Sequence, residues 1–404
     1  MIAPSIARLE RNAFLAILCV GLYATVLGPA LPSFADRLNV SLDTAGLLVT
    51  ALFAGSITAS GALAIRPRPR QSVALTTFGL VAISAGLVLL GAATNWWAAV
   101  GASLVVGVGD GLVVAATHTL IAQISRNVPR GINRLNLVFA VGAVAGPLWF
   151  GFTNEAGAGL PAIYIGLAIF PAVLAIQLLL TGHGRISAAH PGPHEAGVAA
   201  PVPHGGLIAL SMLLFLYVGA EFGLGLWLAS YTERVAGAGR LAASLVTAAY
   251  WLALGLGRYA SGRLFERGRA PSEVLAWSVV GSLIAAAALV LFGGFIVLGG
   301  LAAFAAGFSF GPIWPATMAL AAARSPGGAP ARMVTVGNAG ALLLPWLQGR
   351  LLVGAGPRQG IALTVVLSAG MLILLFIDRP PRVRRQHAEQ SQPSAANDSE
   401  TMRG

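Results

Sequence analysis

The sequence predicts an all-α membrane protein in which twelve transmembrane helices form two six-helix pseudo-repeats. Hydrophobic residues make up 56% of the 404 residues and charged residues only 10%, with a mean hydropathy of +0.79. A soluble domain typically carries about 25% charged residues. The apolar runs, at about 20 residues each, are long enough to cross roughly 30 Å of hydrocarbon. In addition, motifs of the first half of the chain recur in the second half.

Apolar runs define the expected spans in chain order. The first run is too long for a signal-peptide core and is taken as a helix; it holds Cys19, the one cysteine, so no intrachain disulfide can form. The first half is expected to hold helices at 13–34, 44–65, 73–93, 97–124, 131–153 and 161–181. The second half is expected to hold helices at 206–232, 240–264, 272–293, 295–323, 331–354 and 358–377.

These spans divide the chain into four parts. Residues 1–181 form an N-terminal six-helix half and residues 206–378 a C-terminal one. Between them, residues 182–205 are rich in Gly, Pro and Ala, which predicts a cytoplasmic linker. Residues 379–404 are polar and predict a disordered cytoplasmic tail.

The distribution of arginine predicts the orientation. The 25 basic residues are all arginine. If both termini lie on one side, nineteen arginines fall on that side and five on the other, with Arg258 inside a span. The positive-inside rule then places both termini on the cytoplasmic side. The expected location is the cell (inner) membrane. Because the basic residues lie between the spans and not on one face, the net charge of +11 does not indicate nucleic-acid binding.

The internal repeat has an offset near 200 residues. "GAVAGPLWFG" from Gly142 matches "GALLLPWLQG" from Gly340, which aligns Pro147 with Pro345. "GVGDGLVVAATHTLIA" from Gly107 matches "GFSFGPIWPATMALAA" from Gly307. Two parallel repeats joined by a linker are typical of a transporter with its site between the halves.

Several segments resemble the major facilitator superfamily. The Arg-rich turns after the second and eighth spans resemble its cytoplasmic signature, and the second copy, "GRLFERGR", keeps the acid as Glu266. The first copy has Ile65 at that place. "YVGAEFGLGLWLASYTE", "LNLVFAVGAVAGPLWFG" and "GNAGALLLPWLQG" further resemble the branch of fucose/galactose/glucose–proton symporters. The resemblance implies the major facilitator fold, with helices 1, 4, 7 and 10 around a central cavity.

Four ionisable residues lie within expected spans: Asp110, His118, Glu221 and Arg258. Such groups are costly in a bilayer, at about 3 kcal/mol each on insertion scales, and often mark function. Asp110 and Glu221 are the candidates for proton coupling, since the resemblance implies that both face the cavity. The alternative is that each carboxylate is fixed in an ion pair or hydrogen-bond network that sets helix packing. Arg258 is expected to snorkel or to pair with an acid.

Further polar and aromatic residues form the candidate solute site. His118 is eight residues beyond Asp110, about 80° around the helix, and stands where relatives often carry an amide. The other candidates for solute binding are Asn136, Trp227, Tyr250, Trp251, Trp314, Asn338 and Gln348. The alternative is that the aromatic residues are interfacial anchors and the amides are interhelical hydrogen-bonding groups. Pro147, Pro345, Arg258 and Glu266 are expected to act in gating or packing, and the prolines of "GPIWPA" around Trp314 are expected to open the backbone locally.

The sequence thus predicts a proton-coupled secondary active transporter of a small polar solute, with a sugar as one candidate, working by alternating access. The alternatives are a proton-driven efflux antiporter for amphipathic compounds and an uncoupled facilitator or anion carrier. No nucleotide-binding loop, catalytic triad or metal-ligand cluster is recognised, so no enzyme activity, cofactor or metal is expected. The expected partners are the solute, protons and the lipid bilayer, and the expected state is a monomer.

Overall fold

The computed structural model describes residues 6–66, 68, 71–125, 128–180, 204–324 and 329–377. Within them there is no strand. The N-terminal half contains α1 (Ile6–Leu38), α2 (Leu42–Ile65), α3 (Ser72–Ala92), α4 (Trp96–Ile124), α5 (Val128–Glu155) and α6 (Leu160–Leu180). The C-terminal half contains α7 (His204–Ala236), α8 (Arg240–Glu266), α9 (Pro271–Phe292), α10 (Ile296–Phe310), α11 (Ile313–Arg324), α12 (Ala329–Gly354) and α13 (Pro357–Ile377).

Eleven of these segments are long and apolar enough to cross a membrane, with α10 and α11 counted as one span. The fold class predicted from the sequence, an all-α multi-pass membrane protein, is therefore confirmed. Most of the expected linker and the whole expected tail lie outside the described residues. The helices run past the apolar segments at several ends, for example α1, which begins at Ile6.

One expected helix, 295–323, is divided in two at Gly311 and Pro312. Pro312 has no N–H, so it cannot bond to the carbonyl of Phe308 one turn earlier. The N–H of Gly311 still bonds to the carbonyl of Gly307 at 3.0 Å, and regular helix resumes at Ile313. The local opening expected at "GPIWPA" is present, and it is a break between α10 and α11.

The sequence repeat reappears as matched helix packing. Gly107 of α4 lies against the carbonyl of Leu52 in α2, and its repeat mate Gly307 of α10 lies against the carbonyl of Tyr250 in α8. Gly142 and Gly340 likewise face backbone carbonyls, those of Leu18 in α1 and Phe215 in α7. A Cβ at any of the four glycines would overlap the opposing backbone. The small residues therefore set the same close helix crossings in both halves.

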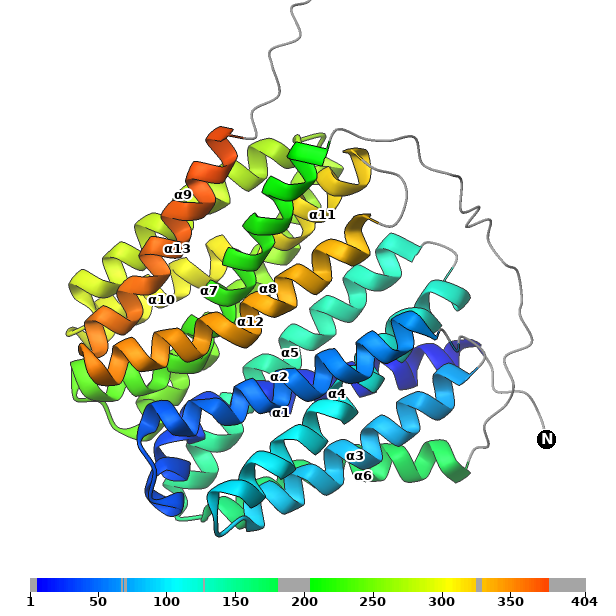
Figure 1. Ribbon diagram of the computed structural model, residues 1–404, viewed down its shortest axis with the longest axis vertical. Helices are drawn as coiled ribbons and strands as arrows, with labels where there is room; N and C mark the ends of the chain where they lie inside the picture. The colour runs from blue at the N-terminus through cyan, green and yellow to red at the C-terminus, as the bar shows by residue number, and fades with distance from the viewer. Residues whose placement is uncertain are drawn as a thin grey trace, which may run out of the picture.

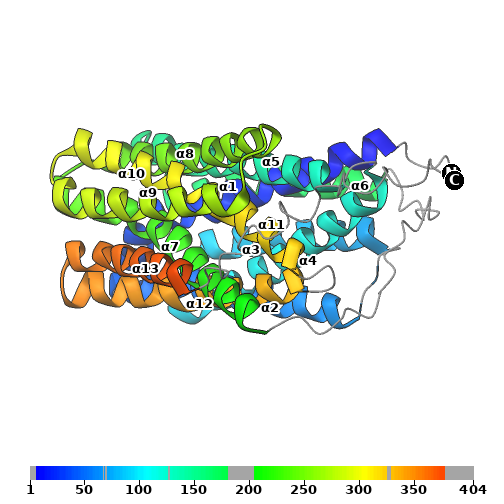
Figure 2. The same ribbon diagram turned by 90° about the horizontal axis from the view of Figure 1, so that it is seen from above.

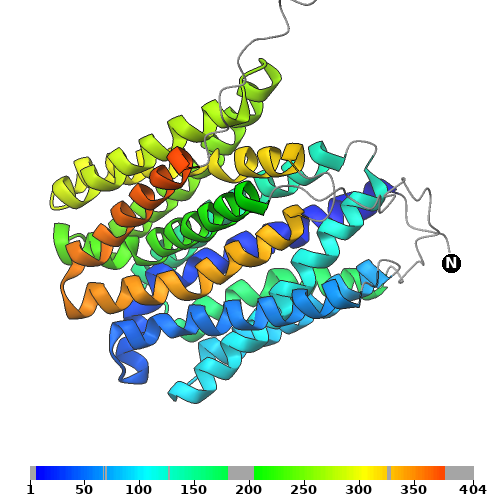
Figure 3. The same cartoon turned by 45° about the horizontal axis from the view of Figure 1, so that its top comes forward.

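The two halves form two bundles that lie side by side (Figures 1 and 3). Short links join α1 to α2 and α7 to α8, and they bend where Asn39 (φ 51°) and Gly237 (φ 63°) adopt left-handed backbone. Among the described residues, the helix pairs in contact across the halves are α1–α7, α1–α8, α2–α12 and α5–α8. These pairs leave α4 and α11 packed only against helices of their own half.

Contacts between the halves gather at the end of the bundle where α1 meets α2 and α7 meets α8, which we call the closed end. Arg350 of α12 lies 2.7 Å from Asp43 of α2, and Arg240 of α8 lies 3.7 Å from Asp36 of α1. The indole of Trp227 fills the space between α2 and α12, because a Cβ at Gly46 would overlap its ring.

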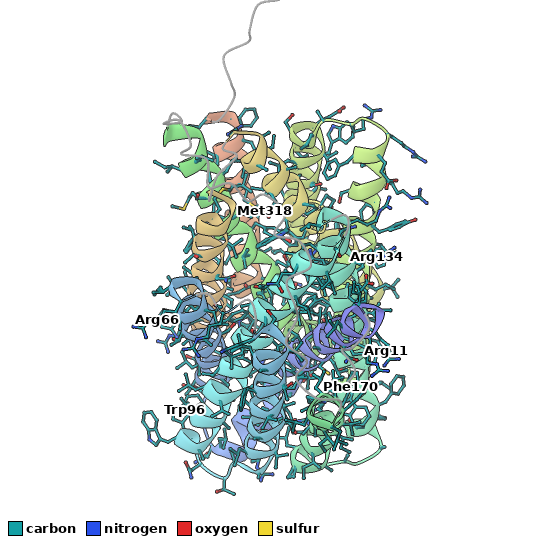
Figure 4. All side chains as sticks on the ribbon, turned by 90° about the vertical axis from the view of Figure 1, so that its right-hand side faces the viewer. Arg11, Arg66, Trp96, Arg134, Phe170 and Met318 are labelled. Atoms are coloured by element: carbon teal, nitrogen blue, oxygen red, sulfur yellow. The ribbon has the colours of Figure 1, made fainter. Side chains whose placement is uncertain are left out.

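The other end, where α1 begins and α2 ends, we call the terminal end. Figure 4 looks toward it, with Arg11, Arg66 and Arg134 on the N-terminal bundle and Met318 on the C-terminal bundle. Seen at right angles to Figure 1, helices of both halves run lengthwise between the two ends (Figure 2). The ion pairs that the described residues form across the halves, Asp43–Arg350 and Asp36–Arg240, both lie at the closed end.

Candidate functional site

A central cavity of about 30 Å³ lies between the halves, with α1 and α2 on one side and α7 and α8 on the other. Its walls are mostly apolar and include the rings of Phe53, Phe222 and Trp251. The hydroxyl of Thr25, also in the wall, donates to the carbonyls of Gly21 and Ala143, each at 3.0 Å. The carbonyl of Ala143 is free to accept because Pro147, one turn later, has no N–H.

Asp110 of α4 is held inside the N-terminal half by two hydroxyl groups from other helices. The hydroxyl of Tyr23 in α1 donates to Oδ1, and Ser56 of α2 donates to Oδ2 at 2.6 Å. Asp110 is buried, and no Arg or His among the described residues forms an ion pair with it. The carboxylate thus ties together three helices by hydrogen bonds to neutral groups.

Glu221 of α7 is held inside the C-terminal half by a cation. Nη2 of Arg258 in α8 lies 3.0 Å from Oε1 of Glu221, with side-chain exposures of 12% and 3%. The hydroxyl of Tyr250 donates to the backbone carbonyl of Glu221 at 2.8 Å. Tyr217, one turn before Glu221, is fully buried, with its ring beside those of Phe310 and Trp314. Both partners of this ion pair therefore sit inside one half and are shielded from solvent.

Neither carboxylate is among the residues that line this cavity. Glu221 is adjacent in sequence to a residue of the cavity wall, Phe222, whereas Asp110 lies in α4, which contributes no residue to the wall. The two acids therefore lie in separate polar clusters, one in each half.

A sequence model of the Major Facilitator Superfamily matches residues 13–336. The chain belongs to the Major Facilitator Superfamily. It is thus a transporter of small solutes, with many apolar helices in the bilayer. Among curated proteins, none matches the chain.

Solved structures of other transporters share the superfamily fold. The chain is 16% identical to a bacterial homologue of the human lysosomal transporter Spinster in an inward-facing, unoccupied conformation, with a TM-score of 0.74 over 95% of this chain and 100% of that one. The inward-facing, occupied form gives 17% identity and a TM-score of 0.70 over 92% and 96%. The nucleoside transporter NupG (D323A mutant) gives 13% identity and a TM-score of 0.69 over 92% and 98%.

Three aromatic candidates of this superfamily member lie near the boundary between the halves. Trp251 lines the cavity, and Tyr250 is buried against Glu221. Trp227 lies at the closed end, where its Nε1 donates to the carbonyl of Pro345 at 2.7 Å. Of these three, only Trp251 contributes to the cavity wall.

The other solute-site candidates of the transporter lie away from that wall. Gln348 is fully buried within the C-terminal half, where its Nε2 lies 3.3 Å from Oγ1 of Thr364 in α13. Nδ1 of His118 lies 2.8 Å from the carbonyl of Val114 in its own helix. Asn136, Asn338 and Trp314 are half-buried and do not line the cavity.

The residues expected to act in gating lie at both ends of the helices. Pro345 accepts the Trp227 hydrogen bond described above, and Pro147 frees the carbonyl that Thr25 uses. Glu266 ends α8 at the surface, 3.7 Å from Arg263 of the same helix. Arg258 pairs with an acid, Glu221, which is one of its two expected roles, and its side chain is 12% exposed.

Sequence reasoning missed Tyr23, Ser56, Phe53 and Phe222. Tyr23 is a polar residue near the middle of an apolar helix, which is a signal that could have identified it. Ser56 and the two phenylalanines carry no comparable signal, because Ser and Phe are common in transmembrane helices. Their importance follows only from which helices pack together.

Proposed function

We propose that this transporter is a proton-coupled secondary active transporter that moves a small solute across the cell (inner) membrane by alternating access. The arginine distribution supports an orientation with both termini in the cytoplasm. In that orientation the closed end faces outward and the terminal end faces the cytoplasm. The described conformation is then inward-facing.

The proposal of proton coupling rests on the hydrogen bonds that Asp110 accepts. Its two oxygens accept hydrogen bonds from the hydroxyls of Tyr23 and Ser56. A hydroxyl can donate to a carboxylate or accept from a carboxylic acid, so it can serve both protonation states by rotation. Asp110 can therefore gain or lose a proton without leaving a buried group unpaired.

Glu221 is less suited to gain and lose a proton alone. Protonation would remove the negative partner of Arg258, and an uncompensated buried guanidinium is costly. We therefore assign the coupling proton to Asp110. Glu221 and Arg258 hold α7 to α8, so that the C-terminal half moves as one body.

Asp110 is connected to the helices that close the outer end. Tyr23 lies in α1, and Ser56 lies in α2. Further along the same two helices, Gly28 of α1 packs on the backbone of Leu226, and Asp43 of α2 pairs with Arg350. A change in the charge of Asp110 alters how α1, α2 and α4 are held together, which biases the contacts at the closed end. This gives a physical route from proton binding to alternating access.

The nature of the cavity wall favours an amphipathic solute over a sugar. Sugar transport, with uptake together with protons, remains the prediction from the resemblance to the fucose/galactose/glucose–proton symporters. A sugar has several hydroxyl groups, and burying each without a partner costs free energy. The cavity wall is largely apolar and aromatic. This supports the second candidate function, proton-driven transport of amphipathic compounds.

The test is uptake by proteoliposomes that contain the purified protein, with and without an imposed pH gradient. The solutes are a sugar, an amino acid, an organic anion and an amphipathic aromatic dye. We expect gradient-driven accumulation of at least one solute, lost in Asp110→Asn, with solute exchange without a gradient retained. The matched control is Glu273→Gln, which alters an acid of α9 that pairs with Arg269 at the surface.

Gradient-driven accumulation that survives Asp110→Asn unchanged would remove Asp110 from coupling. Transport that does not respond to the gradient in the unaltered protein would instead identify a facilitator. An accumulated sugar, rather than the dye, would restore the symporter prediction for the solute while leaving the coupling argument in place.

A further inference from the structure

Trp251, a residue of the cavity wall, carries a buried hydrogen-bond donor without a partner. Trp251 of α8 is 2% exposed, and its Nε1 has no hydrogen-bond partner among the described residues. The six-membered ring of the indole packs on Gly225 of α7, where a Cβ would overlap Cζ2 and crowd Cε2, the carbon bonded to Nε1. Gly225 also lines the cavity. An unpaired buried N–H costs free energy, so a ligand that accepts a hydrogen bond from it gains affinity.

Two half-buried rings lie in the same cavity wall as Trp251. The rings of Phe53 and Phe222 are 5.1 Å apart and nearly perpendicular at 87°, and they come from opposite halves. The Phe222 ring is 6.0 Å from that of Trp251. Unlike Trp251, both phenylalanines keep exposed surface. An aromatic solute can extend this arrangement, because edge-to-face and offset contacts between rings are favourable.

We propose that the cavity binds a planar aromatic solute that carries one hydrogen-bond acceptor, which the indole N–H of Trp251 meets. This deepens the proposed function by giving the class of solute for the same cavity, and it rests on that function. The cavity of about 30 Å³ takes the acceptor end of the solute, while the ring lies against Phe53 and Phe222. The contact reaches both halves, so the solute bridges the surfaces that separate during transport.

The polarity of the wall limits the number of polar groups on the solute. The Thr25 hydroxyl already donates to two carbonyls, and the other wall residues are apolar or glycine, apart from Trp251. A solute with several hydroxyls would therefore bury groups without partners. A solute with one acceptor pairs that acceptor with the indole N–H of Trp251 and buries no other polar group without a partner.

The test compares quinoline with naphthalene, which has the same shape but lacks the ring nitrogen. Equilibrium binding to the full chain in lipid nanodiscs is measured for the unaltered protein and for Trp251→Phe, which keeps a ring and removes the N–H. We expect Trp251→Phe to weaken quinoline by about threefold to tenfold, the value of one hydrogen bond, and to leave naphthalene within twofold. Trp149→Phe is the matched control, because Nε1 of Trp149 donates to the carbonyl of Ile163.

A second variant keeps the proposal testable if Trp251→Phe fails to fold. Phe222→Leu removes a ring from the wall and is expected to weaken both ligands equally. The proposal is overturned if quinoline and naphthalene respond alike to Trp251→Phe, if Phe222→Leu affects neither, or if glucose binds and loses affinity in Trp251→Phe. The assay uses no pH gradient, so a failure of proton coupling does not alter its result.

Discussion

Nη2 of Arg258 lies 3.0 Å from Oε1 of Glu221, and this ion pair joins α8 to α7 inside the C-terminal half. The pair sits beside the break between α10 and α11, since Gly311 packs against the backbone of Arg258. A broken helix depends on packing against its neighbours, and the buried ion pair holds two of those neighbours, α7 and α8, together next to the break. The pair therefore stabilises the region where the tenth span is divided.

Removing one member of the buried pair is expected to be costly. Glu221→Gln should lower the free energy of unfolding by about 3–5 kcal/mol, because it leaves the guanidinium without a counter-charge. The double variant Glu221→Leu with Arg258→Met should recover most of that loss. The measurement is unfolding in bicelles, with the exposed pair Arg269–Glu273 as control, where loss of one partner should cost about 1 kcal/mol or less. Equal losses at both pairs would contradict the argument from burial.

The hydroxyl of Tyr23 should contribute to stability through Asp110. Tyr23→Phe removes a donor to a buried carboxylate and is expected to cost about 1.5–3 kcal/mol, the range for hydrogen bonds to charged groups. Tyr164→Phe is the matched control, because the Tyr164 hydroxyl is buried without a hydrogen-bond partner in the described structure. That variant should be neutral or stabilising. If both variants behave alike in thermal unfolding, the Tyr23 bond carries no stability.

The pair between Asp43 and Arg350 should hold the closed end together. Asp43→Asn is expected to reduce disulfide formation between cysteines placed at 50 and 342, where Oγ1 of Thr50 now lies 3.5 Å from the carbonyl of Leu342. The background variant is Cys19→Ser, since Cys19 is the one native cysteine. The charge exchange Asp43→Arg with Arg350→Asp should restore the yield. Asp36→Asn, which alters the longer and more exposed pair with Arg240, should change the yield less.

Two glycines that touch the same indole should behave differently on substitution. Gly46 and Gly349 each leave space for the ring of Trp227, but Gly46 belongs to the other half and Gly349 to the same half. Gly46→Ala is expected to lower the disulfide yield just described with little change in thermal stability. Gly349→Ala should lower thermal stability, because α7 and α12 pack together within one half. A loss of stability in both would mean that the halves do not separate at this point.

The fold class, most of the spans and the parallel repeat could be predicted from the sequence alone. These follow from local properties: the length of apolar runs sets which segments cross the bilayer, and glycine at matching positions sets close helix contacts. The division of the tenth span could also be anticipated, because proline at 312 removes a backbone donor wherever the helix lies. Asp110, Glu221 and Arg258 likewise stand out from their neighbours in the sequence, because an ionisable group is costly in a bilayer.

The contacts of those residues follow from how the helices pack and could not be predicted from the sequence. Asp110 bonds to residues 87 and 54 positions away, and Glu221 pairs with a residue 37 positions away. Periodicity along one helix gives the face of a side chain but not the helix that meets that face. For this reason the sequence could not assign the partners of the two acids, which lie in separate clusters, one paired with a cation and one held by hydroxyls. The selection of Trp251 from among the aromatic candidates has the same origin, because an unpaired N–H is a property of the packed bundle.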